Sequence, residues 1–248
     1  MAELVYPPVI AAARGAFRAL GLHFDLGGCE QIPSTGGAVL ASNHVSYLDF
    51  LFCGFAARPS RRLVRFMAKD EVFRHRIAGP LMRGMHHIAV DRSAGAGSYL
   101  AAVCALRAGE IVGVFPEATI SRSFTLKEFR SGAARMASEA NVPLIPMVTW
   151  GGQRLLTKGR PRDFTRGRTV VVRVGAPIPP GSPDPAAVMV ELRERMQALL
   201  VDAQHAHPDR AVPGEDSWWM PVHLGGTAPT PEEAAALDGA SRRTPPPG

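Results

Sequence analysis

Residues 38–57 read AVLASNHVSYLDFLFCGFAA, and this stretch decides the fold. Its first five residues, Ala38–Ser42, are apolar or small and predict a buried β-strand. A polar turn with a histidine follows, and Tyr47–Ala57 then has the apolar composition of a helix that packs on a sheet. A strand, a short turn and a helix in this order predict the first half of a strand–helix–strand unit.

The same alternation continues along the chain. Apolar, β-branched runs predict further strands, at Val64–Ala68, Ile88–Val90, Ile111–Phe115, Leu144–Thr149 and Thr169–Val174. Helical spacing predicts further helices, at Val72–Met85, Ser98–Ala108, Phe129–Glu139 and Pro185–Ala203. This spacing predicts an α/β fold with a mainly parallel central sheet flanked by helices on both faces. Because ligands of such sheets bind at the carboxyl ends of the strands, the residues after each strand are the functional candidates.

The turn after the first strand holds side chains suited to acid–base chemistry. A neutral imidazole such as His44 can take a proton from a hydroxyl, while a carboxylate such as Asp49 fixes the ring tautomer. On one continuous helix the two side chains would point about 140° apart. The pair therefore requires His44 in the turn and Asp49 in the first helical turn. Ser46 and Asp49 also match a capping box, so a purely structural role for Asp49 stays open.

Positive charge is concentrated in one stretch of this 248-residue chain, whose net charge is +6. Between Arg58 and Arg92, nine Lys and Arg residues stand against three acidic ones, a surplus equal to that of the whole chain. Apolar residues lie between them, which is typical of a surface that binds anionic membranes, although a solvated basic face is the alternative. Aromatic content is only 7%, and no RNP-like or zinc-finger spacing occurs, so we expect no nucleic-acid partner.

The N-terminal region holds the most apolar segment, Leu4–Leu20, but prolines and arginines interrupt it. It falls short of the ~20 apolar residues that span a bilayer, and it lacks the charged start and cleavage site of a signal peptide. We expect an amphipathic helix over Val9–Leu20, lying on the membrane or on the rest of the protein.

The chain is expected to fall into three parts: an N-terminal helical segment (1–30), an α/β domain (31–204) and a Pro/Gly-rich tail (205–248). The tail holds eight of the 22 prolines, and from Thr227 it is predicted to be mostly disordered, with a short helix at Pro231–Leu237. The adjacent Trp218 and Trp219 either dock on the domain or lie at a membrane interface.

Four blocks of sequence together resemble the glycerolipid acyltransferases, the PlsC-like 1-acylglycerol-3-phosphate acyltransferase family. The family patterns are NHxxxxD, a block ending in DR, FPEGTRS and VPIIPV. Here they read NHVSYLD (43–49), GMHHIAVDR (84–92), FPEATISRS (115–123) and VPLIPM (142–147), in the family's order. FRSGAARMA (129–137) is also similar to the family's FKxGAxxLA, and the resemblance covers about residues 38–177.

This resemblance implies a glycerol-3-phosphate acyltransferase-like fold and an activity. The acyl group of acyl-CoA or acyl-carrier protein would pass to a hydroxyl of lysophosphatidic acid (1-acylglycerol 3-phosphate), giving phosphatidic acid for phospholipid biosynthesis. By resemblance His44 is the general base and Asp49 its partner, and the turn at Asn43–Ser46 could supply backbone N–H donors to the oxyanion. The residues expected to bind the acceptor are Arg92, Glu117, Thr119, Arg122 and Arg130.

The resemblance implies no cofactor and no metal, and a peripheral, monotopic protein on the cytoplasmic face of the cell membrane, which three scattered cysteines also fit. Other acceptors remain open, namely glycerol 3-phosphate, another lysophospholipid or a glycolipid, as does a non-catalytic lipid-binding protein on the same fold.

The third block departs from the family pattern at two positions. Ala118 stands where the family has glycine, at a cost of about 1 kcal/mol if the backbone there needs a positive φ. Ile120 stands where the family has arginine, so Arg122 is the candidate replacement, while Arg130 takes the place of the family's lysine.

Overall fold

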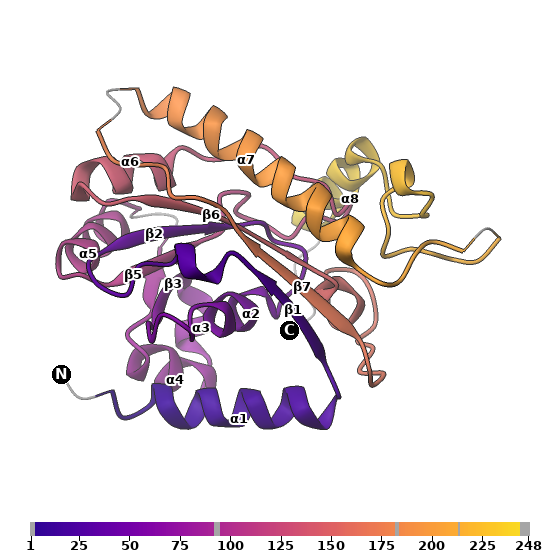
Figure 1. Cartoon of the computed structure of the whole chain (residues 1–248), viewed down its shortest axis with the longest axis horizontal. Helices are drawn as coiled ribbons and strands as arrows, with labels where there is room; N and C mark the ends of the chain where they lie inside the picture. The colour runs from indigo at the N-terminus through magenta and orange to yellow at the C-terminus, as the bar shows by residue number, and fades with distance from the viewer. Residues whose placement is uncertain (1–2, 92–94, 182–183, 213, 244–248) are drawn as a thin grey trace.

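In a computed structural model of the chain, which describes residues 3–91, 95–181, 184–212 and 214–243, seven strands form one sheet (Figure 1). The strand order is β1-β7-β6-β2-β5-β3-β4. The β6–β7 pair is antiparallel and the other neighbouring pairs are parallel, which confirms the predicted mainly parallel α/β sheet. The strands are β1 (His23–Gly27), β2 (Ala38–Ser42), β3 (Val64–Lys69), β4 (Ile88–Val90), β5 (Ile111–Val114), β6 (Leu144–Trp150) and β7 (Thr169–Val174).

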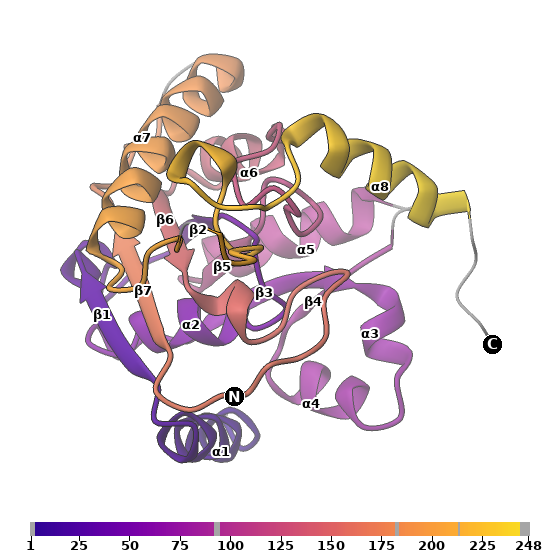
Figure 2. The ribbon, with the colours of Figure 1, turned by 90° about the vertical axis from the view of Figure 1, so that its right-hand side faces the viewer.

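Helices cover both faces of this sheet. In Figures 1 and 2, α5, α6 and α7 lie on one face, and α1 and α2 lie on the other. The helices are α1 (Tyr6–Ala19), α2 (Asp49–Ala56), α3 (Asp70–Arg74), α4 (Ala78–Gly84), α5 (Gly95–Arg107), α6 (Gly132–Ala140), α7 (Pro185–Ala206) and α8 (Pro231–Arg243). Short 3-10 turns occur at η1 (Cys29–Gln31), η2 (Gly152–Arg154) and η3 (Val222–Leu224).

Strand β2 lies at the centre of the sheet, between β5 and β6, and pairs in parallel with both. Its side chains alternate between the two cores: Val39 and Ala41 pack on the side of α5–α7, and Ala38 and Leu40 pack on the side of α2. All five of its residues are buried, as expected for a strand covered on both faces. Because the parallel strands β2 and β5 end at the same edge, the segments that follow them meet there.

The N-terminal helix α1 packs on the protein. It begins at Tyr6, three residues earlier than predicted, because Pro7 and Pro8 occupy the first turn, where proline is tolerated. Tyr6 and Phe17 are buried, and the Tyr6 hydroxyl donates to the Val64 carbonyl at 2.7 Å. Among the described residues, no helix combines the length and apolar composition that a membrane crossing requires.

Two predictions of local structure are wrong, and one strand is missed. The helix expected at Val72–Met85 is split into α3 and α4, because Pro80 would clash with the preceding turn of a continuous helix and instead lies in the first turn of α4. Strand β1 was not predicted, and it places residues 23–27 in the sheet beside β7. The tail is not mostly disordered over 227–243, since α8 forms there and is longer than the predicted helix.

The tryptophan pair of the tail docks on the domain. Trp219 is buried beside His207, and the guanidinium of Arg154 lies 4.2 Å from the centre of the Trp219 indole. Trp218 contacts Phe124. This arrangement favours the docked alternative over a membrane interface.

Candidate active site

His44 and Asp49 meet at the carboxyl edge of the sheet. His44 lies in the turn after β2 and Asp49 is the first residue of α2, and their Nδ1 and Oδ2 atoms are 2.9 Å apart. The predicted geometry of the pair is therefore confirmed. The His44 ring stacks on Phe115, with centroids 4.2 Å apart and planes inclined by 18°. The Asp49 side chain is fully buried, whereas that of His44 is 20% exposed.

The hydrogen bonds of Asp49 fix the tautomer of His44. Its Oδ2 also accepts the backbone N–H groups of Val45 and Ser46, both at 2.7 Å, and its Oδ1 accepts the Thr149 hydroxyl at 2.8 Å. An ionised carboxylate can only accept hydrogen bonds. Nδ1 of His44 is therefore the protonated ring nitrogen and donates a hydrogen bond to Asp49. The other ring nitrogen, Nε2, then presents a lone pair and can receive a proton.

Asp49 also holds the turn before α2, since its carboxylate accepts the Ser46 N–H. The helix begins at Asp49 with Leu48 as its N-cap, so Ser46 and Asp49 do not occupy the positions of the predicted capping box. The Ser46 hydroxyl instead accepts from the Leu48 N–H and donates to the Leu156 carbonyl. The N–H groups of His44, Val45 and Ser46 all donate to side-chain carboxyl oxygens, so any oxyanion donor near this turn would have to be another group.

The loop after β5 forms two hydrogen bonds with the backbone of His44, one with its N–H and one with its carbonyl. Oε1 of Glu117 accepts the His44 N–H at 2.9 Å, and the Ser121 N–H donates to the His44 carbonyl at 2.7 Å. Oε2 of Glu117 accepts the Lys127 N–H at 3.1 Å. Burial raises the pKa of Glu117 to about 8, against the lowering effect of these two hydrogen bonds. Both oxygens of Glu117 therefore already bind the chain's own backbone.

The two departures from the family pattern have structural consequences in this loop. Ala118 has a φ of +58°, a left-handed conformation that costs roughly 1–2 kcal/mol for a residue with a Cβ. Ile120 is buried in the interior, so the family's arginine position holds an apolar side chain that faces no solvent. The basic side chain nearby comes from Arg122, two residues later.

Sequence-predicted acceptor residues lie in different surroundings. Thr119 accepts a hydrogen bond from Lys127 Nζ at 2.8 Å, and Arg122 pairs with Asp238 of α8. Arg130 is exposed, and its backbone N–H donates to the Pro116 carbonyl. Arg92 lies outside the described residues.

Sequence reasoning missed several polar residues of the site. Thr149 anchors Asp49, and the Asn43 side chain donates to and accepts from the Thr149 backbone at 3.0 and 2.8 Å. Lys127, Lys158 and Asp238 form ion pairs beside the loop after β5. The start of α8 did carry a signal: Thr230 and Glu233 form a reciprocal capping box around Pro231.

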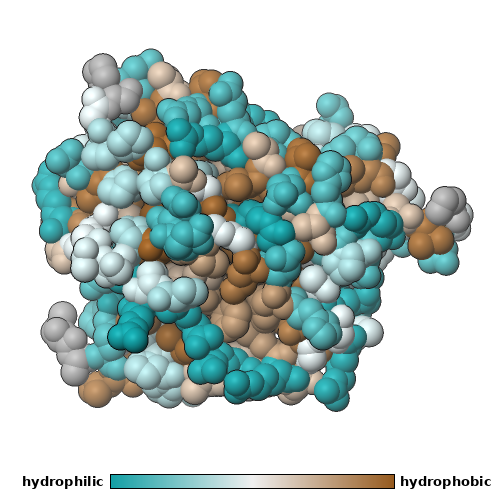
Figure 3. Space-filling model, in the orientation of Figure 1, coloured by the Kyte–Doolittle hydropathy of each residue, from teal (hydrophilic) through white to brown (hydrophobic). Residues whose placement is uncertain are grey.

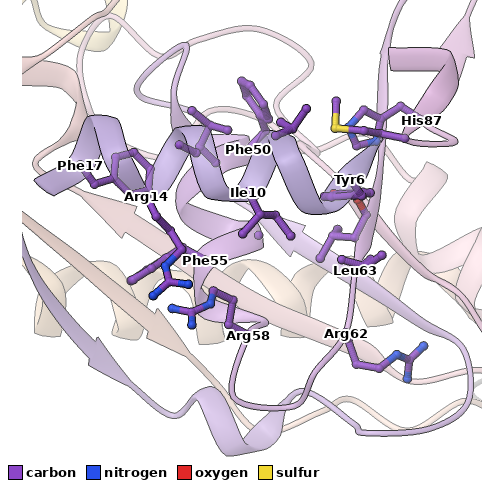
Figure 4. Close-up of a pocket in the computed structure, with 16 residues that line it drawn as sticks. Tyr6, Ile10, Arg14, Phe17, Phe50, Phe55, Arg58, Arg62, Leu63 and His87 are labelled. Carbon is purple, nitrogen blue, oxygen red and sulfur yellow. The ribbon is translucent and has the colours of Figure 1, made fainter. Parts of the chain in front are cut away.

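An apolar groove lies between α1 and α2. Figure 3 shows apolar surface above α1, bordered by hydrophilic residues. The groove encloses about 50 Å³, and its lining includes Ile10, Phe17, Phe50, Phe55 and Leu63, with Arg14, Arg58 and Arg62 (Figure 4). Ring contacts link it to the candidate base: Phe50 contacts Phe66, Phe66 stacks on Phe115, and Phe115 stacks on His44.

In the part of the chain that the structure describes, no group of three or more His, Cys, Asp and Glu side chains could hold a metal ion. His87 is a core histidine: it is buried, and its Nδ1 accepts the Phe66 N–H at 3.0 Å.

Comparison with known proteins decides the family. Residues 23–150, which carry β1 to β6 and the His44–Asp49 pair, match the family described as Acyltransferase. The chain belongs to the acyltransferase family. The crystal structure of the 1-acyl-sn-glycerophosphate (LPA) acyltransferase PlsC from Thermotoga maritima has the same fold, with a TM-score of 0.67 and 21% identity over 82% of this chain and 81% of that one.

Curated relatives of this acyltransferase chain share a similar level of identity. The 1-acyl-sn-glycerol-3-phosphate acyltransferase of Bacillus subtilis (strain 168) is 32% identical over 136 residues, which is 53% of this chain and 66% of that protein. The alpha enzyme of that name from Bos taurus is 32% identical over 163 residues, 64% of this chain and 55% of its own length. The matches thus span less than two thirds of either relative, and α8 lies outside the family match.

Proposed function

We propose that this acyltransferase moves a fatty acyl group from acyl-CoA or acyl-carrier protein to a glycerol hydroxyl of 1-acylglycerol 3-phosphate. The product is phosphatidic acid, for phospholipid biosynthesis. The observation that carries the proposal is the 2.9 Å contact between Nδ1 of the partly exposed His44 and the buried Asp49 carboxylate, which leaves Nε2 of the ring for a substrate proton. The relatives named 1-acyl-sn-glycerol-3-phosphate acyltransferase support the choice of acceptor.

The proposed chemistry needs one base and one electrostatic partner. Nε2 of His44 takes the proton of the acceptor hydroxyl as its oxygen attacks the thioester carbonyl carbon. Asp49 stabilises the imidazolium that forms, and the imidazolium returns the proton to the thiolate when the carbon–sulfur bond breaks. The oxygen–carbon bond of the ester replaces the thioester bond, so these steps require neither a cofactor nor a metal.

The apolar groove between α1 and α2 is the proposed place for a fatty chain. Its lining is mainly aliphatic and aromatic, as is typical of sites that take an apolar ligand. The ring contacts through Phe50, the buried Phe66 and Phe115 connect its lining to the His44 ring. Arg14, Arg58 and Arg62 line the same groove and can attract anionic head groups.

The acceptor's phosphate is proposed to bind beside the loop after β5, where Arg122 and Lys127 lie. Arg92 and Arg130 remain predicted contacts of the acceptor, and Thr119 a predicted contact of its hydroxyl groups. Glu117 is proposed to act through His44, because both of its oxygens accept backbone N–H groups.

The membrane contact is proposed to lie on α3 and α4, which pack together (Figure 2). Val72, Ile77 and Leu81 are exposed there, Ile77 by 73%. The exposed Arg74 and Arg76 lie in the same segment. Apolar side chains among basic ones suit an anionic bilayer surface, and each basic residue adds about 1 kcal/mol of attraction. We place this peripheral contact at the cytoplasmic face of the membrane.

The test is an acyl-transfer assay with labelled palmitoyl-CoA and lysophosphatidic acid. The His44→Ala variant should lose at least about 100-fold in rate, which is the usual contribution of a general base. His223→Ala, which alters an exposed histidine of η3, is the matched control and should retain the parental rate. Equal rates for His44→Ala and the parent would refute the base assignment.

A panel of acceptors under the same conditions identifies the substrate. Glycerol 3-phosphate, other lysophospholipids and a glycolipid are compared with lysophosphatidic acid at one acyl-CoA concentration. Failure to acylate any acceptor, with binding of lipid retained, would instead support a non-catalytic lipid-binding protein.

A further inference from the structure

The Asp238 carboxylate of α8 forms ion pairs with three basic side chains. Oδ1 of Asp238 accepts from Lys158 Nζ at 2.6 Å and from Arg122 Nε at 3.2 Å, and Oδ2 accepts from Lys127 Nζ at 2.8 Å. Asp238 is 6% exposed, and its basic neighbours hold the pKa of its carboxyl at about 2. It is therefore ionised at neutral pH.

This cluster adjoins the loop that holds the candidate base. Lys127 Nζ also donates to the Thr119 hydroxyl, and the Lys127 backbone N–H bonds to the Glu117 carboxylate that holds the N–H of His44. Among these four residues alone, three cations and one carboxylate leave an excess of two positive charges. A phosphomonoester carries roughly −1.5 to −2 at pH 7, so its charge matches this excess.

Asp238 is one attachment of α8 to the rest of the protein. Over residues 231–240, the buried side chains are Ala234 and Asp238, which lie four residues apart on one face of the helix. An alanine side chain buries little apolar area, and Gly239 lowers the intrinsic stability of the helix. A helix of 13 residues is marginal by itself in water. The ion pairs of Asp238 therefore help to hold α8 on the domain.

We propose that Asp238 is a resident counter-anion in the phosphate subsite of the acceptor, formed by Arg122, Lys127 and Lys158, and that an incoming phosphomonoester displaces this carboxylate and releases α8. This inference rests on the proposed acceptor-binding role of the loop after β5. Because a ligand must compete with a charged carboxylate, neutral acceptors gain nothing at this subsite and dianionic ones are selected. Asp238 is thus a selectivity residue that lies outside the region matched to the family.

The kinetic test compares Asp238→Asn with Glu232→Gln, which removes the same charge from an exposed position of the same helix. With the competitor gone, Asp238→Asn should lower the KM for lysophosphatidic acid about tenfold, in line with the loss of a charged hydrogen-bond competitor. The KM of the acyl donor and that of the Glu232→Gln variant should stay at parental values. A raised KM for lysophosphatidic acid in Asp238→Asn would overturn the proposal, since the carboxylate would then organise the cations for binding.

The closing experiment needs no acyl transfer. Hydrogen exchange of the wild-type chain is measured with inorganic phosphate, with glycerol 3-phosphate, and with potassium chloride at equal ionic strength. Binding that displaces Asp238 must loosen α8 by linkage, so amides of residues 231–243 should exchange several-fold faster with either phosphate than with chloride. Unchanged or slower exchange would refute the displacement. Faster exchange in a chain that acylates no acceptor would refute the proposed function and leave the subsite standing.

Discussion

Replacing Thr149 by valine tests whether the buried carboxylate of the site depends on its anchor. The change keeps the shape of a fully buried side chain and removes the hydroxyl that donates to Asp49 Oδ1 at 2.8 Å. A hydrogen bond to a charged group contributes about 1.5–3 kcal/mol, and Asp49 has no solvent to replace it. For a chain of 248 residues, that loss lowers the melting temperature by roughly 3–12 °C.

The rate of acyl transfer should fall with the stability. Without its Oδ1 partner the Asp49 carboxylate is held through Oδ2 alone, so the His44 ring is oriented less tightly. A misplacement of about 1 Å costs up to ~10²-fold, so kcat should fall about 10- to 100-fold. Thr149→Ser keeps the hydroxyl and is the matched control. Thermal unfolding followed by circular dichroism, together with kcat, decides the matter: a Thr149→Val variant that melts and reacts like the parent would refute the reasoning.

Two other substitutions probe the strained loop and the membrane contact. Ala118→Gly should raise the unfolding free energy by about 0.5–1 kcal/mol in urea titrations, because relief of the positive φ outweighs the added entropy of the unfolded chain. Ala101→Gly, on the exposed side of α5, should lower it by about 1 kcal/mol; a loss at both positions would contradict the strain. Ile77→Glu should bind anionic vesicles at least about tenfold more weakly than the parent in co-sedimentation. The control is Leu100→Glu, which alters another exposed apolar residue outside α3 and α4 and should bind like the parent. Equal binding by both variants would place the membrane contact elsewhere.

The sequence predicts the central strands well because burial on both faces leaves an apolar run with clear ends. Ala38–Ser42, which is buried throughout, has the predicted bounds. Strand β1 escapes prediction because the exposed His23 and Asp25 break its apolar run. The break between α3 and α4 is encoded by Pro80, which a reading by periodicity alone passes over.

For the candidate site, the sequence predicts what is local and misses what is distant. His44 and Asp49 are five residues apart, so a turn and a helix start suffice to bring them together. Thr149 reaches Asp49 from a strand 100 residues away, and Asp238 reaches Arg122 from 116 residues away. Sequence motifs are defined by short, fixed spacings, so they do not reveal contacts between residues this far apart in the chain. The proline content of the tail predicts disorder, because composition does not reveal an ion cluster that orders α8 only once the domain has folded.

The two hydrogen bonds between the loop after β5 and the His44 backbone have a consequence for protein engineering. Glu117 accepts a hydrogen bond from the His44 N–H, and the Ser121 N–H donates to the His44 carbonyl. The position of the His44 backbone therefore depends on the position of this loop. Grafting residues 115–123 from a homologue to change the acceptor would therefore also shift the histidine. Chimeras that exchange residues 43–49 in the same step should retain turnover where single-loop grafts lose it.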